Sequence, residues 1–196
     1  NPDHALFPYY TSDKIMESAG ITGSFTAVRI RQEGKTLLWE PFSELHGLFY
    51  HTELNLYKNV PGNKLVYESV NHDLKLVFRY SWTTSPRYGF VRRAEIENNG
   101  SEIFEIELLD GLQNILPAGL NEQLQNARSN LVDAYKKQER VPATNLVLYR
   151  LSSIIIDRPI PAEALSCNVC YMPDSGELPL ILSSLQVEAF RKGQDL

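Results

Sequence analysis

Two cysteines in the C-terminal third of the chain have the spacing of a metal-binding or redox motif. Cys167 and Cys170 form a Cys-x-x-Cys sequence. A zinc site needs about four ligands, usually two such pairs or one pair with two closely spaced histidines. All histidines lie far upstream, at His4, His46, His51 and His72. Residues 165–172 also have strand character, which would direct the two thiols to opposite faces. We therefore predict free structural cysteines, no metal and no cofactor.

Asp110 is the carboxylate best placed for a site. It follows the predicted strand 103–109 and precedes Gly111, and sites often lie at strand ends. An Asp-Gly pair is also ordinary turn chemistry, which is the favoured interpretation. Glycoside hydrolysis needs a second carboxylate across the scissile bond, and the spacing offers no recognisable partner. The nucleophile-elbow, P-loop and dinucleotide-binding motifs are absent from the sequence, so no catalytic residue is predicted.

Aromatic side chains are the remaining candidates, because exposed rings can stack on sugar rings. Trp82 and Tyr80 continue an apolar strand face, which favours packing in the core. The same argument applies less strongly to Trp39, which precedes Glu40 and Pro41. The residues retained as candidates for carbohydrate binding are Trp39, Trp82, Tyr88 and Asp110.

The composition excludes several classes of partner. The chain has 196 residues, is 43% hydrophobic and 22% charged, and has a formal net charge of −5. Nucleic acids and anionic membranes require a basic face, and no run of Lys or Arg here exceeds the pair Arg92-Arg93, whose side chains would alternate between faces of a strand. We predict no nucleic-acid partner. No stretch of about 18 apolar residues predicts a membrane span.

Alternating apolar and polar residues predict the strands that would position these candidates. A strand pair is expected at 24–31 and 36–40, followed by a meander from Glu53 with turns near 60–63 and 71–73. The run 90–120 predicts two strands joined by a tight turn at 98–101, with one face of the second strand apolar. A helix is expected from Asn121 to 141–142, anchored by Leu124, Leu131 and Tyr135, and strands resume at 146–156 and 165–172.

These elements predict an all-β fold with a minor α component, arranged as a large two-sheet antiparallel β sandwich. One domain covering residues 1–196 is expected. Because the chain begins at Asn1-Pro2 without a methionine, we expect a fragment of a longer protein, with residues 175–196 as the start of a linker to a missing domain. The compartment is not predicted.

Several segments resemble the N-terminal β-sandwich domain of bacterial proteins related to cellobiose phosphorylase and similar glycoside phosphorylases. The resemblance covers about the first 160 residues and is strongest at Leu109-Asp110-Gly111-Leu112-Gln113-Asn114-Ile115-Leu116-Pro117. The other matching segments are Leu38-Trp39-Glu40-Pro41-Phe42, Asn55-Leu56-Tyr57-Lys58-Asn59, Phe90-Val91-Arg92-Arg93 and residues 125–137.

The resemblance implies a galactose-mutarotase-like sandwich of the supersandwich type. In that family the sandwich supports a helical (α/α)6 barrel, which contains the catalytic carboxylate, and contributes to dimer contacts. It therefore implies a non-catalytic domain of a carbohydrate-active enzyme, with the C-terminal catalytic domain of the same chain as partner and a homodimer as a further contact. Two alternatives stay open: a carbohydrate-binding module that uses exposed aromatic residues, and a mutarotase-like sugar epimerase that uses a histidine and a carboxylate.

Overall fold

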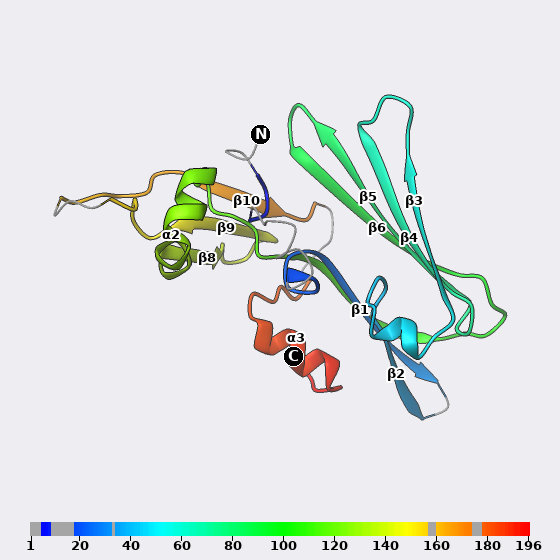
Figure 1. Cartoon of the computed structure of the whole chain (residues 1–196). Coiled ribbons are helices and arrows are strands. Elements are labelled where there is room, and N and C mark those ends of the chain that lie inside the picture. The colour runs from blue at the N-terminus through cyan, green and yellow to red at the C-terminus, as the bar shows by residue number, and fades with distance from the viewer. Residues whose placement is uncertain (1–4, 9–17, 33, 157–159, 174–177) are drawn as a thin grey trace. The chain divides into compact units, whose positions relative to one another are not determined.

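β-Strands dominate the computed structural model of the chain (Figure 1). The structure describes residues 5–8, 18–32, 34–156, 160–173 and 178–196. These residues form three antiparallel sheets, the helices α2 (Glu122–Tyr135) and α3 (Ser184–Arg191), and the short 3-10 helix η2 (His46–Leu48). The predicted all-β class with a minor α component is confirmed.

The chain forms two compact units, which are described separately. The sandwich unit comprises Thr26–Asp110 and Phe190–Asp195. The mixed unit comprises the described parts of Asn1–Phe25 and Gly111–Ala189, with Leu196. The expectation of one domain over residues 1–196 stays a prediction.

Two sheets make up most of the sandwich unit. The four-stranded sheet has the order β3-β4-β5-β6, and the three-stranded sheet has the order β2-β1-β7. The predicted strand pair at 24–31 and 36–40 and the predicted meander from Glu53 are confirmed. The strands are β1 Gly23–Gln32, β2 Lys35–Trp39, β3 Thr52–Lys58, β4 Lys64–Asn71, β5 Leu76–Ser85, β6 Gly89–Asn98 and β7 Glu105–Gln113.

Side chains from both sheets meet in one apolar core. Val28, Ile30 and Trp39 come from the three-stranded sheet, and Leu76 and Phe78 come from β5. All five are buried, and residues that alternate along each strand point to this core from one face of each sheet. Two sheets with a shared apolar interior constitute a β sandwich.

The predicted hairpin between residues 90 and 120 is wrong. β6 pairs with β5, whereas β7 lies beside β1 in the other sheet. Polar contacts explain why the chain passes from one sheet to the other. Asn99 N–H donates to the Lys75 carbonyl at the β4–β5 turn. Arg29 and Arg31 of β1 both pair with Glu107 of β7. The residues of the predicted turn thus connect two sheets instead of adjacent strands.

The predicted apolar face of β7 is only partly covered. Phe104 packs against the core, but Ile106 and Leu108 stay partly exposed. Glu107, on the opposite face, is half-buried in its ion pairs with β1. β7 is the edge strand of its sheet, so its apolar side chains have a neighbouring strand on one side only.

The segment after residue 189 completes the sandwich unit. Phe190 is buried, and the Arg29 guanidinium lies 4.1 Å from the centre of its ring. Arg191 donates to both carboxylate oxygens of Glu40, at 2.5 and 3.0 Å. In the range predicted to begin a linker, residues 175–177 lie outside the described part and residues 184–191 form α3.

The mixed unit packs α2 against a three-stranded sheet of order β10-β9-β8. Its strands are β8 Lys136–Arg140, β9 Leu146–Leu151 and β10 Cys167–Tyr171. The predicted cap at Asn121 is confirmed, because its side-chain oxygen accepts the Leu124 N–H at 2.8 Å. The predicted strands at 146–156 and 165–172 are confirmed with shorter bounds.

Two predictions for α2 are wrong. The helix ends at Tyr135 and the chain continues as strand β8, where Glu139 pairs with Arg150 across the sheet. Leu131 is 43% exposed, and Val132 is buried instead. Arg128 has non-helical backbone angles, which rotates the residues after it relative to a continuous helix. Leu124 and Tyr135 do pack against the core of this unit, as predicted.

Candidate functional site

The inner face of the four-stranded sheet, defined as the face with Leu76 and Phe78, extends beyond the core. By the register of the strands, Tyr67 and Leu56 share this face with Tyr80, and Leu65 shares it with Trp82. Leu56 is 62% exposed and Phe90 is 59% exposed. We call Leu56, Leu65, Tyr67, Trp82 and Phe90 the distal strip. By strand register the distal strip lies toward the β3–β4 and β5–β6 turns, which are at the top of the four-stranded sheet in Figure 1.

Aromatic rings in and beside the distal strip contact one another. Tyr67 stacks on Tyr80 with ring centres 4.7 Å apart and planes 13° apart. Trp82 meets Phe90 edge-on, at 6.4 Å between centres. Tyr80 also belongs to the border of the core. The strip is therefore an aromatic continuation of the core face that is partly open to solvent.

Asp110 lies within a strand and not at its end, because β7 continues to Gln113. Its two carboxylate oxygens accept from the two terminal nitrogens of Arg92 at 2.6 and 2.7 Å. Thr26 Oγ1 donates to the same carboxylate at 2.6 Å. The Arg92 guanidinium lies 4.9 Å from the centre of the Tyr80 ring. Asp110 therefore forms a largely buried ion pair that joins β6 to β7, and the turn role favoured by the sequence is wrong.

The other candidate residues for carbohydrate binding are dispersed. Trp39 is fully buried in the core, so stacking on a sugar would require the core to open. Tyr88 is about half exposed and lies under the guanidinium of its neighbour Arg87, at 5.1 Å. Trp82 is half-buried in the distal strip. Trp39, Trp82 and Asp110 thus lie at separate places along the inner face, and Tyr67, Phe90 and Arg92, beside the last two, were not among the predicted site residues.

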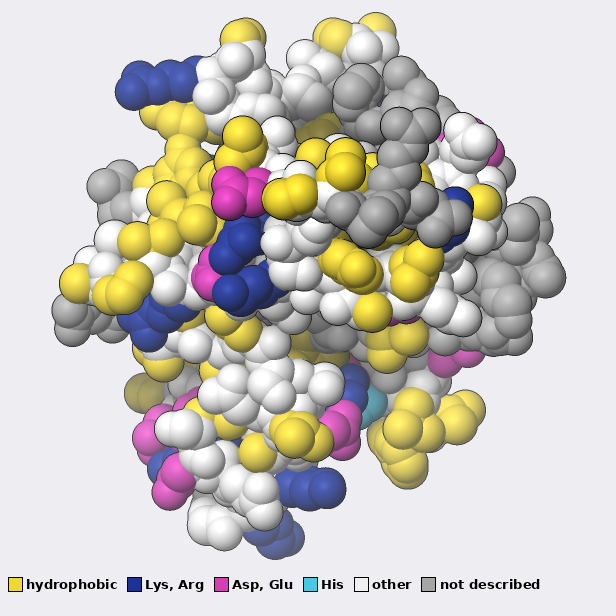
Figure 2. Space-filling view, turned by 90° about the vertical axis from the view of Figure 1, so that its left-hand side faces the viewer, with side chains coloured by type: hydrophobic (Ala, Val, Ile, Leu, Met, Phe, Trp, Pro, Cys, Tyr) yellow, Lys and Arg dark blue, Asp and Glu magenta, His cyan; other side chains and the backbone are white. Residues whose placement is uncertain are grey.

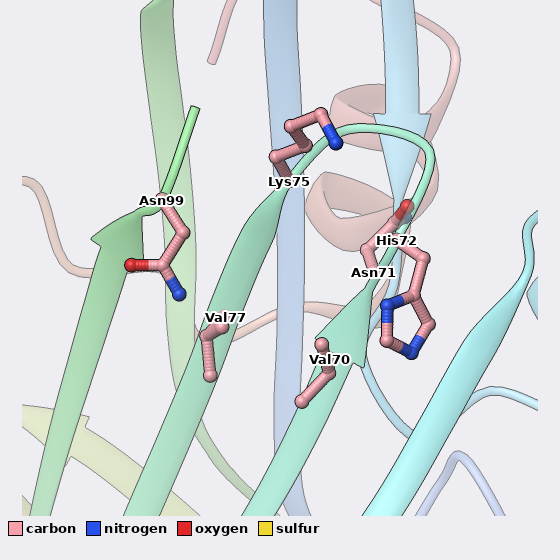
Figure 3. A pocket seen from close by; sticks show the side chains of 6 residues that line it. All are labelled: Val70, Asn71, His72, Lys75, Val77 and Asn99. Atoms are coloured by element: carbon pink, nitrogen blue, oxygen red, sulfur yellow. The ribbon is translucent and has the colours of Figure 1, made fainter. Parts of the chain in front are cut away.

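A histidine and a carboxylate approach each other near a surface pocket. His72 Nε2 lies 3.5 Å from Glu53 Oε2, and both side chains are solvent-exposed. Figure 3 shows His72 and Asn99 on either side of Val70 and Val77, in a pocket of about 200 Å³. Glu53 is not among the described residues that line this pocket. His72 and Glu53 therefore do not share one cleft, so this pair gives no support to the epimerase alternative.

A smaller pocket of about 100 Å³ lies between η2 and the inner face, and we call it the η2 pocket. Phe42 and Leu54 contribute apolar side chains to its wall, and Phe42 has a positive φ of 69°. Its polar side chains come from Glu40, Glu44, His46, Thr52 and Ser69. Trp39, a candidate from the sequence, also lines this pocket. The other lining residues come from three separate segments and were not predicted, because no local pattern brings these segments together.

The cysteines behave as the strand geometry predicts. Cys167 lies opposite Arg150 and Cys170 opposite Val147 in β10 and β9, so their side chains point to opposite faces. Both are free thiols, and Cys167 is exposed. Burial raises the pKa of the Cys170 thiol and raises the pKa of Tyr149, close to it, to about 12. In the described part of the chain no three His, Cys, Asp or Glu residues converge as a metal site.

Comparison with known proteins gives no family assignment: no family model and no curated protein matches this chain. The described helices include none with the length and apolarity needed to span a membrane. The β-sandwich-like structure is confirmed. The resemblance to glycoside phosphorylases stays an expectation from the sequence.

Proposed function

We propose that this chain is a non-catalytic β-sandwich module of a carbohydrate-active enzyme and that its distal strip packs against a further domain. The exposure of Leu56 and Phe90, on the same sheet face that forms the core, is the observation that supports this. Apolar patches at the surface of a protein commonly mark interaction sites, and large aromatic residues are enriched there. The carbohydrate-active class comes from the sequence resemblance.

Exposed apolar residues also occur elsewhere on the molecule. Figure 2 shows hydrophobic side chains at separate places on one face of the molecule, with charged side chains between them. Single exposed apolar residues are normal for a soluble protein. The members of the distal strip are neighbours by strand register and continue the sheet face that forms the core of the sandwich unit.

Hydrogen exchange tests the interface. The amides of Leu56 and Phe90 should exchange more slowly in the complete gene product that contains these 196 residues than in this chain alone. The outer-face residues Tyr57 and Val91 serve as controls within the same strands. Equal rates at the strip, or a gene without further coding sequence, would contradict the proposed interface.

Enzyme assays test the absence of catalysis. The chain incubated with cellobiose and phosphate should release no sugar phosphate above a mock preparation, because no nucleophile or paired carboxylate is recognisable in the sequence. Turnover that persists after further purification would contradict the proposal.

Carbohydrate binding on the distal strip is the second candidate, favoured by the exposed ring of Phe90 and the half-buried ring of Trp82 beside it. The chain has two tryptophans, so its NMR spectrum should contain two indole N–H signals. A saturable shift of the Trp82 signal on addition of cellobiose, lost in Tyr67→Ala, would favour this candidate. Our first proposal predicts no saturable shift of that signal.

A further inference from the structure

We propose that the η2 pocket is a binding site for one edge of a neutral polyhydroxylated molecule such as a pyranose sugar. The site is separate from the distal strip and does not rest on the proposed function. It is formed within the sandwich unit by the segment from Trp39 to Gly47, by Thr52 and Leu54 of β3, and by Ser69 of β4.

A buried hydroxyl without a partner identifies this pocket as a site. Ser69 is 1% exposed, and its Oγ has no hydrogen-bond partner among the described residues. Its register with Phe78 places its side chain on the inner face, where the pocket lies. Buried polar groups without partners are rare and costly. A ligand hydroxyl could satisfy Ser69 as donor or acceptor.

The other polar side chains favour a ligand group that both donates and accepts. The Glu40 backbone N–H donates to His46 Nδ1 at 3.4 Å, so a neutral His46 has its proton on Nε2 and offers a donor there. Thr52 adds a hydroxyl, and Glu44 adds a carboxylate acceptor. Hydroxyl groups match this mixture. An ammonium group could use only the acceptors.

The charges at the pocket disfavour an anion. Glu40 and Glu44 both line it, and Glu40 is bound by Arg191. No basic side chain among the described residues pairs with Glu44 in the structure. A phosphate or carboxylate ligand would therefore meet an unbalanced negative charge. A neutral ligand avoids this repulsion.

The size of the pocket limits how much of a ligand it can hold. A volume of about 100 Å³ is below the roughly 300–1,000 Å³ of pockets that enclose whole ligands. We therefore expect one edge of a ring to enter, with millimolar affinity. Leu54 is the cross-strand neighbour of Ser69 and lines the pocket, so a smaller side chain there should widen access to the hydroxyl.

Amide NMR titration with D-glucose tests the site in the intact chain. The Gly47 and Ser69 amides should shift saturably. Ser69→Ala should weaken binding about three- to ten-fold, the range expected for one hydrogen bond. Ser81→Ala is the matched control, because Ser81 lies on the opposite face of the same sheet and should leave the affinity unchanged.

Two further variants change the space in the pocket without removing a polar group. A Cβ at Gly47 would lie 3.8 Å from Thr52 Oγ1, an ordinary contact, so Gly47→Ala should fold normally and weaken binding. Leu54→Ala should strengthen binding, a gain that misfolding cannot produce. Together they distinguish occupancy of the pocket from a general effect on the sandwich.

Several outcomes would overturn the proposal. These are no saturable shift with glucose in either the unmodified chain or Leu54→Ala, or an affinity unchanged by Ser69→Ala. Tighter binding of methylammonium or inorganic phosphate than of glucose would show that the ligand class is wrong. A glucose response at the Trp82 indole alone would assign sugar binding to the distal strip instead.

Discussion

The two faces of the four-stranded sheet differ in the kind of side chain that they present to solvent. On the outer face a row of polar side chains crosses all four strands, from Asn55 through Glu68 and Arg79 to Glu95. Arg79 pairs with Glu68 and, at 2.6 Å, with Glu97. On the inner face the row from Leu56 through Tyr67 and Tyr80 to Ala94 is apolar and aromatic.

The difference shows which surface needs a partner. Outer-face side chains satisfy one another within the sheet: Tyr57 OH donates to Glu68 at 2.9 Å and Asn55 donates to it at 3.2 Å. The apolar side chains of the inner face gain stability only by burial. The three-stranded sheet buries the part around Phe78, whereas Leu56 and Phe90 stay exposed. The inner face is therefore where a further partner of this unit is expected.

The largest expected effect comes from the covered part of the inner face. Phe78 is fully buried between the sheets, so Phe78→Ala should lower the free energy of unfolding by about 3–5 kcal/mol. Denaturant unfolding followed by circular dichroism measures this loss. A change below about 1 kcal/mol would mean that the two sheets do not share a tight core.

The next largest effect is expected for the ion pair between Arg92 and Asp110, beside the distal strip. Arg92→Met would leave the largely buried Asp110 carboxylate without its cation and should cost about 3 kcal/mol. Arg93→Met is the control, because Arg93 is exposed on the other face of β6. If both variants lose the same stability in urea titrations, the pair contributes nothing specific.

A smaller, pH-dependent effect is expected on the outer face. Burial opposes ionisation of Glu68, but hydrogen bonds from Arg79, Tyr57 and Asn55 outweigh it and lower the pKa of this carboxyl below 4.5. Its ionised form then stabilises the fold fully above about pH 4.5, and this contribution is lost as the pH falls through the lowered pKa. Glu68→Gln should cost about 2 kcal/mol at pH 7 and clearly less at pH 3. Thermal unfolding at both pH values, with the exposed Glu95→Gln as control, measures this; a cost that does not depend on pH contradicts it.

The smallest effect is expected in the distal strip itself. Leu56→Ala should change the free energy of unfolding by less than about 0.5 kcal/mol, because Leu56 is largely exposed. Equilibrium unfolding at two protein concentrations measures it. A larger cost that grows with concentration would indicate that a second copy covers the strip, as the expected homodimer would.

Local sequence signals predicted the strands well but not their partners. Alternation and turn residues located β3 to β6 to within a few residues. The turn at 98–101 gave no indication that β7 would leave its neighbour, since the cause is the pairing of Glu107 with Arg29 and Arg31, more than 70 positions away. Charges on an alternating strand do not show in advance which strand they will face.

Local signals also failed where the backbone conformation of one residue changes which side chains of a helix face the core. A regular helix would have buried Leu131, but the conformation of Arg128 buries Val132 instead. Trp39 shows the same limit for the site. Its ring type suggested sugar stacking, and only the tertiary contacts with Phe78 and Ile30 place it in the core.

The contact between Glu40 and Arg191 joins residues 151 positions apart. A second contact, the hydrogen bond that Arg29 donates to the Gln194 carbonyl, spans 165 positions. Contacts of such long range form slowly, because a long chain must close first. During synthesis, which proceeds from the N-terminus, Arg29 and Glu40 emerge long before the partners that will cover them. The sandwich unit should therefore reach its final packing late, and a nascent chain stopped before Phe190 should leave the outer face of β1 and β2 accessible to chaperones.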